Sequence, residues 1–201
     1  MKLSSSLLKI ALAIISATLP HIAYAQSVPA ATQRLQLSVF VAGADTLTNL
    51  AGGKNRDLTV GANLTFPTVG LLRQSLEFRG TYPINKGNVS DQRSFLFGPK
   101  IEHSWGKLHP YVDFFIGRGK IEYNTPGFIF GNNMYISSTT VVYSPGAGLD
   151  YNITHHLGVK ADVQLQRWNT PATELGTISP TVVTVGAIYS LDFNSRHHRG
   201  L

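Results

Sequence analysis

Eight segments of this chain alternate apolar and polar side chains with a period of two residues. In the segment 157–166, Leu, Val and Ala at odd positions alternate with Gly, Lys, Asp and Gln at even positions, without exception. A period of two places one set of side chains on each face of a β-strand, so the pattern predicts strands. The segments are 33–42, 58–66, 76–82, 95–102, 111–117, 141–151, 157–166 and 182–193.

The connections between these segments are alternately long and short. The long ones are 45–56, 83–92, 122–138 and 169–180, and the short ones are 67–72, 104–107 and 154–156. Tight turns at one end and long loops at the other are typical of an outer-membrane barrel with its turns in the periplasm. The predicted fold is therefore all-β, an eight-stranded antiparallel up-and-down transmembrane β-barrel with both termini on the periplasmic side.

The distribution of charge indicates which face of the barrel points outward. One face is almost uninterrupted Leu, Val, Ile, Phe and Tyr, as lipid requires, whereas the other is rich in Gly, Ser, Thr, Asn and Gln. A soluble lipocalin-like barrel has the same period with the faces exchanged, and its exterior would carry charge at many more positions. The charges on the polar face, predicted to line the lumen, are Glu77, Arg79, Lys100, Glu102, Asp113, Asp150, Lys160, Asp162 and Asp192.

An eight-stranded barrel has an interior just wide enough for side chains to fill it. We therefore expect a polar plug in which charges pair across neighbouring strands, because buried charges are tolerated only with partners. The expected pairs are Glu77–Arg79, Lys100–Glu102 and Lys160–Asp162. A gated ion path and acid/base catalysis are the alternative roles for the same charges.

The first 25 residues have the form of a cleaved signal peptide. Lys2 and Lys9 flank the start of an apolar stretch, Pro20 interrupts it, and Ala23-Tyr24-Ala25 has the small-x-small form of a cleavage site. The alternative, a buried N-terminal helix, would lack a cap and end at the proline. The predicted organisation is a signal peptide (1–25), a barrel domain (26–193) and a short basic periplasmic tail (194–201).

Composition excludes several classes of function. Without the signal peptide the chain has 15 basic and 11 acidic residues, a net charge of +4, and the positive charges are scattered among acids. No Lys/Arg stripe indicates nucleic-acid binding. The absence of cysteine excludes disulfides, thiolate metal sites and a cysteine nucleophile. No cofactor is predicted.

The signal peptide, the eight alternating segments and the closing pattern Val183-x-Val185-x-Ala187-x-Tyr189-x-Leu191-x-Phe193 resemble the small outer-membrane β-barrel proteins of Gram-negative bacteria, the OmpA-like or porin-like barrel class. The resemblance covers nearly all of residues 33–193. It implies outer-membrane lipid as surroundings and contact with the barrel-assembly machinery during insertion. It also implies that Phe193 is the terminal aromatic residue of the assembly signal and Tyr189 its upstream aromatic. The family usually ends at that aromatic residue, whereas residues 194–201 follow it here.

Sequence alone favours a structural or surface-interaction component of the outer membrane. The alternatives are a narrow porin-like channel and a lipid-modifying barrel enzyme. We single out no catalytic residues. Hydrolysis of lipid A at the outer leaflet would require a serine activated by a histidine. The histidines are predicted at the periplasmic end, remote from that leaflet. Those histidines are His103, His109, His155, His156, His197 and His198. No metal site is predicted; binding of Zn, Ni or Cu by these histidines, or their joint protonation as the pH falls, is the alternative. An extracellular ligand is not identified.

The connection 122–138 is unusually apolar for an extracellular loop. Phe128, Phe130 and Tyr135 are candidates for contact with a ligand, a surface or a partner. The alternative is that the two flanking strands simply extend as a hairpin with Asn132-Asn133 at its tip.

Overall fold

The fold is described from a computed structural model of the chain. It describes residues 35–48, 53–67, 72–85, 90–124, 127–170 and 175–192, with the backbone alone for Phe128, Phe130 and Asp192. The predicted signal peptide, Phe193 and the tail 194–201 lie outside these residues. Within them there is no helix long and apolar enough to cross a membrane.

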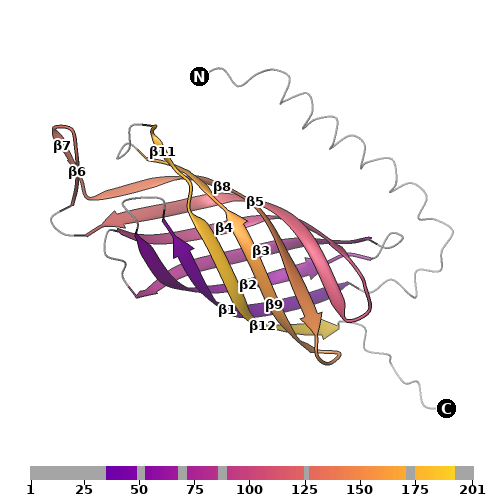
Figure 1. Cartoon of the computed structure of the whole chain (residues 1–201). Helices are drawn as coiled ribbons and strands as arrows, with labels where there is room; N and C mark the ends of the chain where they lie inside the picture. The colour runs from indigo at the N-terminus through magenta and orange to yellow at the C-terminus, as the bar shows by residue number, and fades with distance from the viewer. Residues whose placement is uncertain are drawn as a thin grey trace, which may run out of the picture. The chain divides into compact units, whose positions relative to one another are not determined.

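Eight antiparallel barrel strands close into a barrel (Figure 1). We call each of the eight a stave, because two of them are divided between two of the labelled strands. The strands are β1 (Gln36–Leu47), β2 (Lys54–Thr65), β3 (Leu72–Asn85), β4 (Ser90–His103), β5 (Leu108–Tyr123), β6 (Phe128–Phe130), β7 (Asn133–Tyr135), β8 (Ser137–Asn152), β9 (Leu157–Leu165), β10 (Arg167–Asn169), β11 (Thr177–Ile178) and β12 (Thr181–Asp192). β1 pairs with both β2 and β12, and β9 pairs with both β8 and β12, so the sheet has no open edge. The predicted fold class is confirmed.

The seventh and eighth staves are each divided between two strands. β10 continues β9, because Gly146 pairs with Gln164 and Tyr143 pairs with Arg167 in one unbroken register. Pro145, which has no backbone N–H, lies between these pairs and interrupts the ladder. β11 and β12 together form the eighth stave. They pair with β10 and β9, the two parts of the seventh stave, in one common register.

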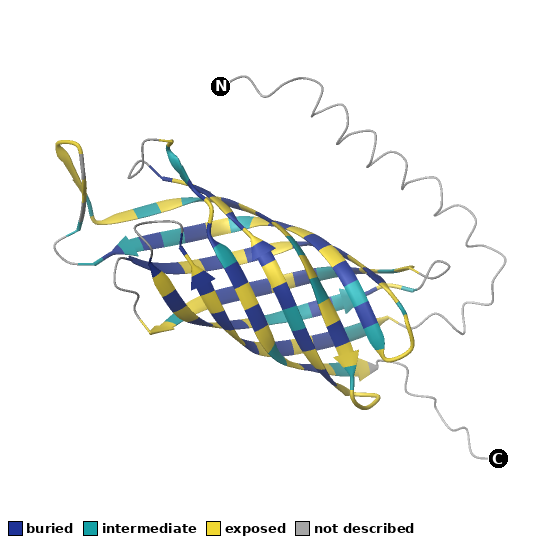
Figure 2. Ribbon diagram, in the orientation of Figure 1, coloured by how far each residue is buried: buried dark blue, intermediate teal, exposed yellow. Residues whose placement is uncertain are grey.

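The two faces of the staves differ as the sequence predicted. Buried and exposed positions alternate along each stave, which Figure 2 shows as bands of dark blue and yellow. On neighbouring residues of β5 and β4, Val112 is 60% exposed whereas Lys100 is completely buried. The apolar face therefore points outward, and the polar, charged face points into the lumen.

The two ends of the barrel differ in their connections. Short turns join β2 to β3, β4 to β5, and β8 to β9 at one end, the turn end. The other end, the loop end, carries the β1–β2 and β3–β4 connections, which are no longer than the turns, and the long β5–β8 connection, from which the β6–β7 hairpin projects (Figure 1).

Several predicted loops were too long. β1 and β2 extend into 45–56, and β3 and β4 extend into 83–92, because backbone pairing continues where both faces of the strands become polar. A periodic apolar pattern marks only the part of a strand that has one apolar face.

Candidate functional site

Arg79 lies in the lumen and binds carboxylates on opposite walls. Its Nε donates to Oε1 of Glu77 at 2.8 Å. Its Nη1 and Nη2 donate to the two oxygens of Asp162 at 3.2 and 3.1 Å. Glu77 lies on β3 with Arg79, whereas Asp162 lies on β9, with three strands between β3 and β9 in either direction around the barrel. This bidentate pair ties two opposite walls together.

Two lysines extend this ion network. Lys160 Nζ donates to Glu77 Oε2 at 3.0 Å. Lys100 Nζ donates to Asp150 Oδ2 at 2.5 Å and lies 3.3 Å from Glu102 Oε2. Both lysines and Glu77 are completely buried. Such burial is tolerable only because each charge has an opposite charge beside it.

The predicted partners meet, but the prediction that they bridge neighbouring strands was wrong. Each pair lies along a single strand, because side chains two residues apart point to the same face. These pairs are Glu77–Arg79, Lys100–Glu102 and Lys160–Asp162. The links between strands are Arg79–Asp162, Lys160–Glu77 and Lys100–Asp150.

Asp113 is held by an amide. Gln164 Nε2 donates to both carboxylate oxygens of Asp113, at 2.9 and 3.1 Å, and the Ser144 hydroxyl donates to Gln164 Oε1 at 2.9 Å. Sequence reasoning placed Gln164 on the lumen face but gave it no role. For Asp192 the structure gives only its place in β12.

Aromatic rings cover the cations of the network, which sequence reasoning missed. Arg79 lies 4.6 Å from the ring centroid of Phe115, and Lys100 lies 3.9 Å from that of Tyr111. The Tyr111 hydroxyl also donates to Asp162 Oδ2 at 3.2 Å. Cation–π contact of this kind stabilises a desolvated charge. The signal in the sequence was an aromatic residue on the charged face of a strand.

Glycines on the lumen face make room for large side chains. A Cβ atom at Gly148 would lie 2.4 Å from the Tyr111 hydroxyl and ring, and one at Gly119 would lie 2.2 Å from the Trp168 ring. Since such distances are impossible for real atoms, these glycines and aromatic residues form complementary pairs.

An apolar cluster lies in the lumen between the network and the loop end, on the side formed by β4, β5, β8, β10 and β11. Sequence analysis predicted a polar plug and did not anticipate this cluster. Its members are Leu96, Phe115, Ile121, Tyr123, Val142, Trp168 and Ile178. They point inward because the strands keep their alternation above the charged layer. Trp168 satisfies its Nε1 by donating to Gln166 Oε1 at 2.8 Å. The lumen therefore has an ionic layer and, nearer the loop end, an apolar cluster on one side.

A polar cavity of about 520 Å³ lies at the turn end. Its lining includes Arg73, Glu102, His109, Asp150, Asn152 and Ser190. Arg73 Nε lies 3.2 Å from Glu102 Oε1, and its Nη2 donates to Gln36 Oε1 at 2.7 Å. Since Asp150 also binds Lys100, the ion network closes the inner end of this cavity.

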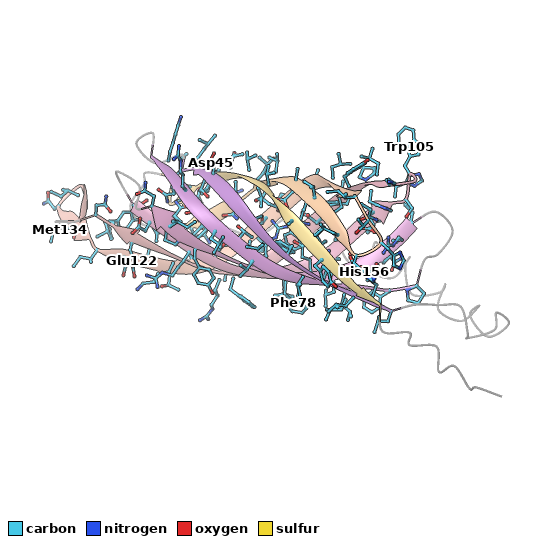
Figure 3. All side chains as sticks on the ribbon, turned by 90° about the horizontal axis from the view of Figure 1, so that it is seen from below. Asp45, Phe78, Trp105, Glu122, Met134 and His156 are labelled. Carbon is cyan, nitrogen blue, oxygen red and sulfur yellow. The ribbon has the colours of Figure 1, made fainter. Side chains whose placement is uncertain are left out.

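Four of the predicted histidines lie at the turn end. His103 ends β4, and His109 is buried at the start of β5. His155 and His156 lie in the β8–β9 turn, where Figure 3 labels His156. The rings of His155 and His156 are 5.0 Å apart. No group of three or more His, Asp or Glu residues in the described ranges could hold a metal ion. His197 and His198 lie outside the described residues.

The outer surface at the loop end carries a charged cluster on β4 and β5. Arg93 lies directly opposite Lys120. Lys120 Nζ lies 2.6 Å from Glu122 Oε1, and Arg93 Nη2 lies 2.8 Å from Glu122 Oε2. The hydrogen bond from Lys120, together with Arg93, lowers the pKa of Glu122. Arg118 is exposed beside them, so positive charge is in excess here.

The apolar loop forms a hairpin, but as a separate two-stranded sheet and not as the simple extension of the flanking strands β5 and β8 that sequence offered as an alternative. β6 and β7 pair, and the turn residue Gly131 has a φ of 60°, which favours glycine. The tip is Gly131-Asn132, one residue earlier than expected. Met134 is 55% exposed at the extremity of the loop end (Figure 3), and Ile129 and Ile136 are also exposed.

The three candidate contact residues of this hairpin have different places. Tyr135 is half-buried against the apolar cluster, which makes it a support for the loop. The side chains of Phe128 and Phe130 are not among those described.

The assembly-signal residues are only partly described. Tyr189 lies on the outward face of β12, 46% exposed, and its ring stacks on that of His156 with centroids 6.0 Å apart. Phe193 lies outside the described residues.

No protein family model matches the chain, and neither does any curated protein sequence. Solved structures do match its fold. Neisserial surface protein A (NspA) is 13% identical, with 79% of this chain and 97% of that chain covered and a TM-score of 0.50. Ail, the attachment invasion locus protein of Yersinia pestis, solved with the heparin analogue sucrose octasulfate, is 15% identical, with 79% and 99% covered and a TM-score of 0.51. At such identities the likeness establishes the fold, a closed eight-stranded barrel of the outer-membrane type.

Proposed function

We propose that this chain is an integral outer-membrane protein whose lumen is plugged and which acts as a structural or surface-interaction component. In this orientation the turn end and both termini face the periplasm and the loop end faces outward. The outward apolar face supports a place in lipid, because exposed Leu, Val, Phe and Tyr cover the staves. Ail and NspA, which share the fold, support the same location.

The observation that carries the proposal is the ion network across the lumen. Arg79 and Lys160 join β3 to β9, and the apolar cluster lies nearer the loop end. An ion would have to separate buried pairs at a cost of several kcal/mol and then pass the part of the lumen that the apolar cluster narrows. This arrangement favours a closed barrel over the narrow porin-like channel.

A role at the cell surface is supported by the loop end. The exposed apolar hairpin and the basic cluster of Arg93, Arg118 and Lys120 lie on the part of the barrel that would face outward. Apolar surface rimmed by charge is typical of contact sites. The ligand is a matter for binding experiments with the whole protein.

We propose no enzymatic activity. The histidines in the described part of the chain lie at the turn end, away from the hairpin and from the outer leaflet in the proposed orientation (Figure 3). Mass spectrometry of lipid A from expressing cells should therefore show no mass shift. A shift in the mass of lipid A that requires the folded protein would support the alternative, a lipid-modifying enzyme.

Fractionation tests location and folding together. The protein should be recovered with outer membranes, and unheated samples should migrate differently from boiled ones on gels, because a closed barrel resists detergent until it is heated. Recovery as a soluble periplasmic protein would refute the proposal.

A further inference from the structure

A second polar cluster lies inside the loop end of the barrel, apart from the ion network. It consists of Thr46 on β1, Asn55 and Asp57 on β2, and Gln92 on β4, all on the lumen side and each no more than 3% exposed. Asp57 lies opposite Pro83 on β3, and the β3–β4 register, in which Thr81 lies opposite Ser94, places Gln92 at the level of Pro83. Thr46 lies directly opposite Asn55 in the β1–β2 ladder. Asp57 follows Asn55 by two residues and so points to the same face.

The hydrogen-bonding capacity of this cluster is largely unused. The Thr46 hydroxyl donates to Oδ2 of Asp57. Within the described part of the chain, Asp57 Oδ1 and both polar atoms of the Asn55 and Gln92 side chains have no hydrogen-bond partner. Buried polar groups are almost always satisfied, since each unsatisfied one costs about 1–3 kcal/mol. Several such groups at one place indicate that a polar species binds there.

The charge of the cluster indicates a cation. In the ion network, Glu77, Asp150 and Asp162 each have a lysine or arginine beside them. Asp57 has no such ion pair with a described residue, although it is equally buried. The negative charge of Asp91 also acts on it. A buried carboxylate without a counter-charge is strongly unfavourable.

We propose that this cluster is a binding site for a divalent cation of the calcium class. The protein ligands are Asp57 Oδ1 and the amide oxygens of Asn55 and Gln92, completed by water. Asn55 and Asp57 have Cα atoms about 6.6 Å apart, twice the rise of a strand residue, so one ion can lie between their side chains. Ligands that are exclusively oxygen select hard cations, and amide oxygens in a flexible arrangement suit calcium better than magnesium.

The charge of the site sets its expected affinity. With few carboxylates, dissociation constants of about 10⁻⁴–10⁻³ M are expected, as in extracellular calcium modules. The ion would join β2 to β4 inside the rim and stabilise the loop end.

The test is equilibrium dialysis of the folded full-length protein in detergent micelles against radioactive calcium, after removal of metal with EDTA. We expect about one equivalent of saturable calcium for the wild type, at least a tenfold loss of affinity in Asp57→Asn, and unchanged binding in Asp45→Asn. Asp45 is a matched control, because it lies on the neighbouring strand β1 but its side chain is 74% exposed. Heat-modified gel migration shows that each variant is folded.

A second variant protects the test against a folding failure. Gln92→Leu keeps all charges and should weaken calcium binding without abolishing folding. Absence of saturable uptake by the wild type, equal uptake by the wild type and Asp57→Asn, or tighter binding of magnesium than of calcium would each overturn the assignment. Calcium-dependent protection of the loop end in hydrogen exchange, lost in Asp57→Asn, would support it.

Discussion

At the scale of single residues, Arg79 is the most connected charge in the lumen. It contacts Glu77, Asp162 and the Phe115 ring. Removing it leaves two buried carboxylates with less positive charge beside them. We expect Arg79→Ala to lower the free energy of unfolding by about 3–5 kcal/mol, the range for breaking a buried pair from one side.

The control is Val163→Ala, an outward position on the same stave as Asp162. Lipid replaces the lost contacts there, so its effect should be much smaller. Urea unfolding in lipid vesicles, with gel migration as a second readout, measures both variants. Equal losses would show that the network contributes no more than a lipid-facing side chain.

The glycines of the lumen give a second residue-scale prediction. Gly148→Leu should destabilise the barrel by about 2 kcal/mol or more, because the Tyr111 ring occupies the space of the new side chain. Gly43→Ala is the matched control. A Cβ atom there would lie 4.0 Å from its nearest neighbour, Val185 O, so the unfolding midpoint of this variant should change little. Thermal unfolding in the same detergent compares the two.

At the scale of elements, the β6–β7 hairpin is separable from the barrel. It pairs only with itself among the described strands. Replacing residues 127–135 by an Asn-Gly turn should leave heat-modified migration intact, with a small loss of stability because Tyr135 packs on the apolar cluster. Binding of the protein to cell or matrix surfaces should fall. Binding that persists unchanged would transfer the contact role to another loop.

The elements also show how far sequence predicts such a fold. Alternation predicted the eight staves and their faces, because lipid and lumen impose opposite demands on successive residues. The ends of β3 and β4 were missed, because pairing outside the apolar band leaves no periodic signal. The partner of Arg79 on β9 was missed as well, since contacts across a closed barrel depend on curvature and stagger, which no local pattern records.

At the scale of the whole molecule, the ion network and the apolar cluster in the lumen predict that the barrel conducts no ions. If the lumen is plugged as proposed, the purified barrel should show no reproducible single-channel steps in planar bilayers, because the ion network would have to be broken to open a path. A larger porin, inserted under the same conditions, is the positive control. Stable unitary currents from the folded protein, removed by boiling, would show an open path and favour the channel.

The bond between Arg79 and Asp162 also bears on how the barrel forms. The two residues belong to the third and seventh staves, so they can come into contact only when the barrel is almost closed. A half-rolled sheet in the bilayer would keep the ion pairs along each strand but lack the Arg79–Asp162 and Lys160–Glu77 links across the lumen, and would be too unstable to accumulate. Insertion and rolling-up should therefore occur as one concerted event, without a long-lived partly inserted form.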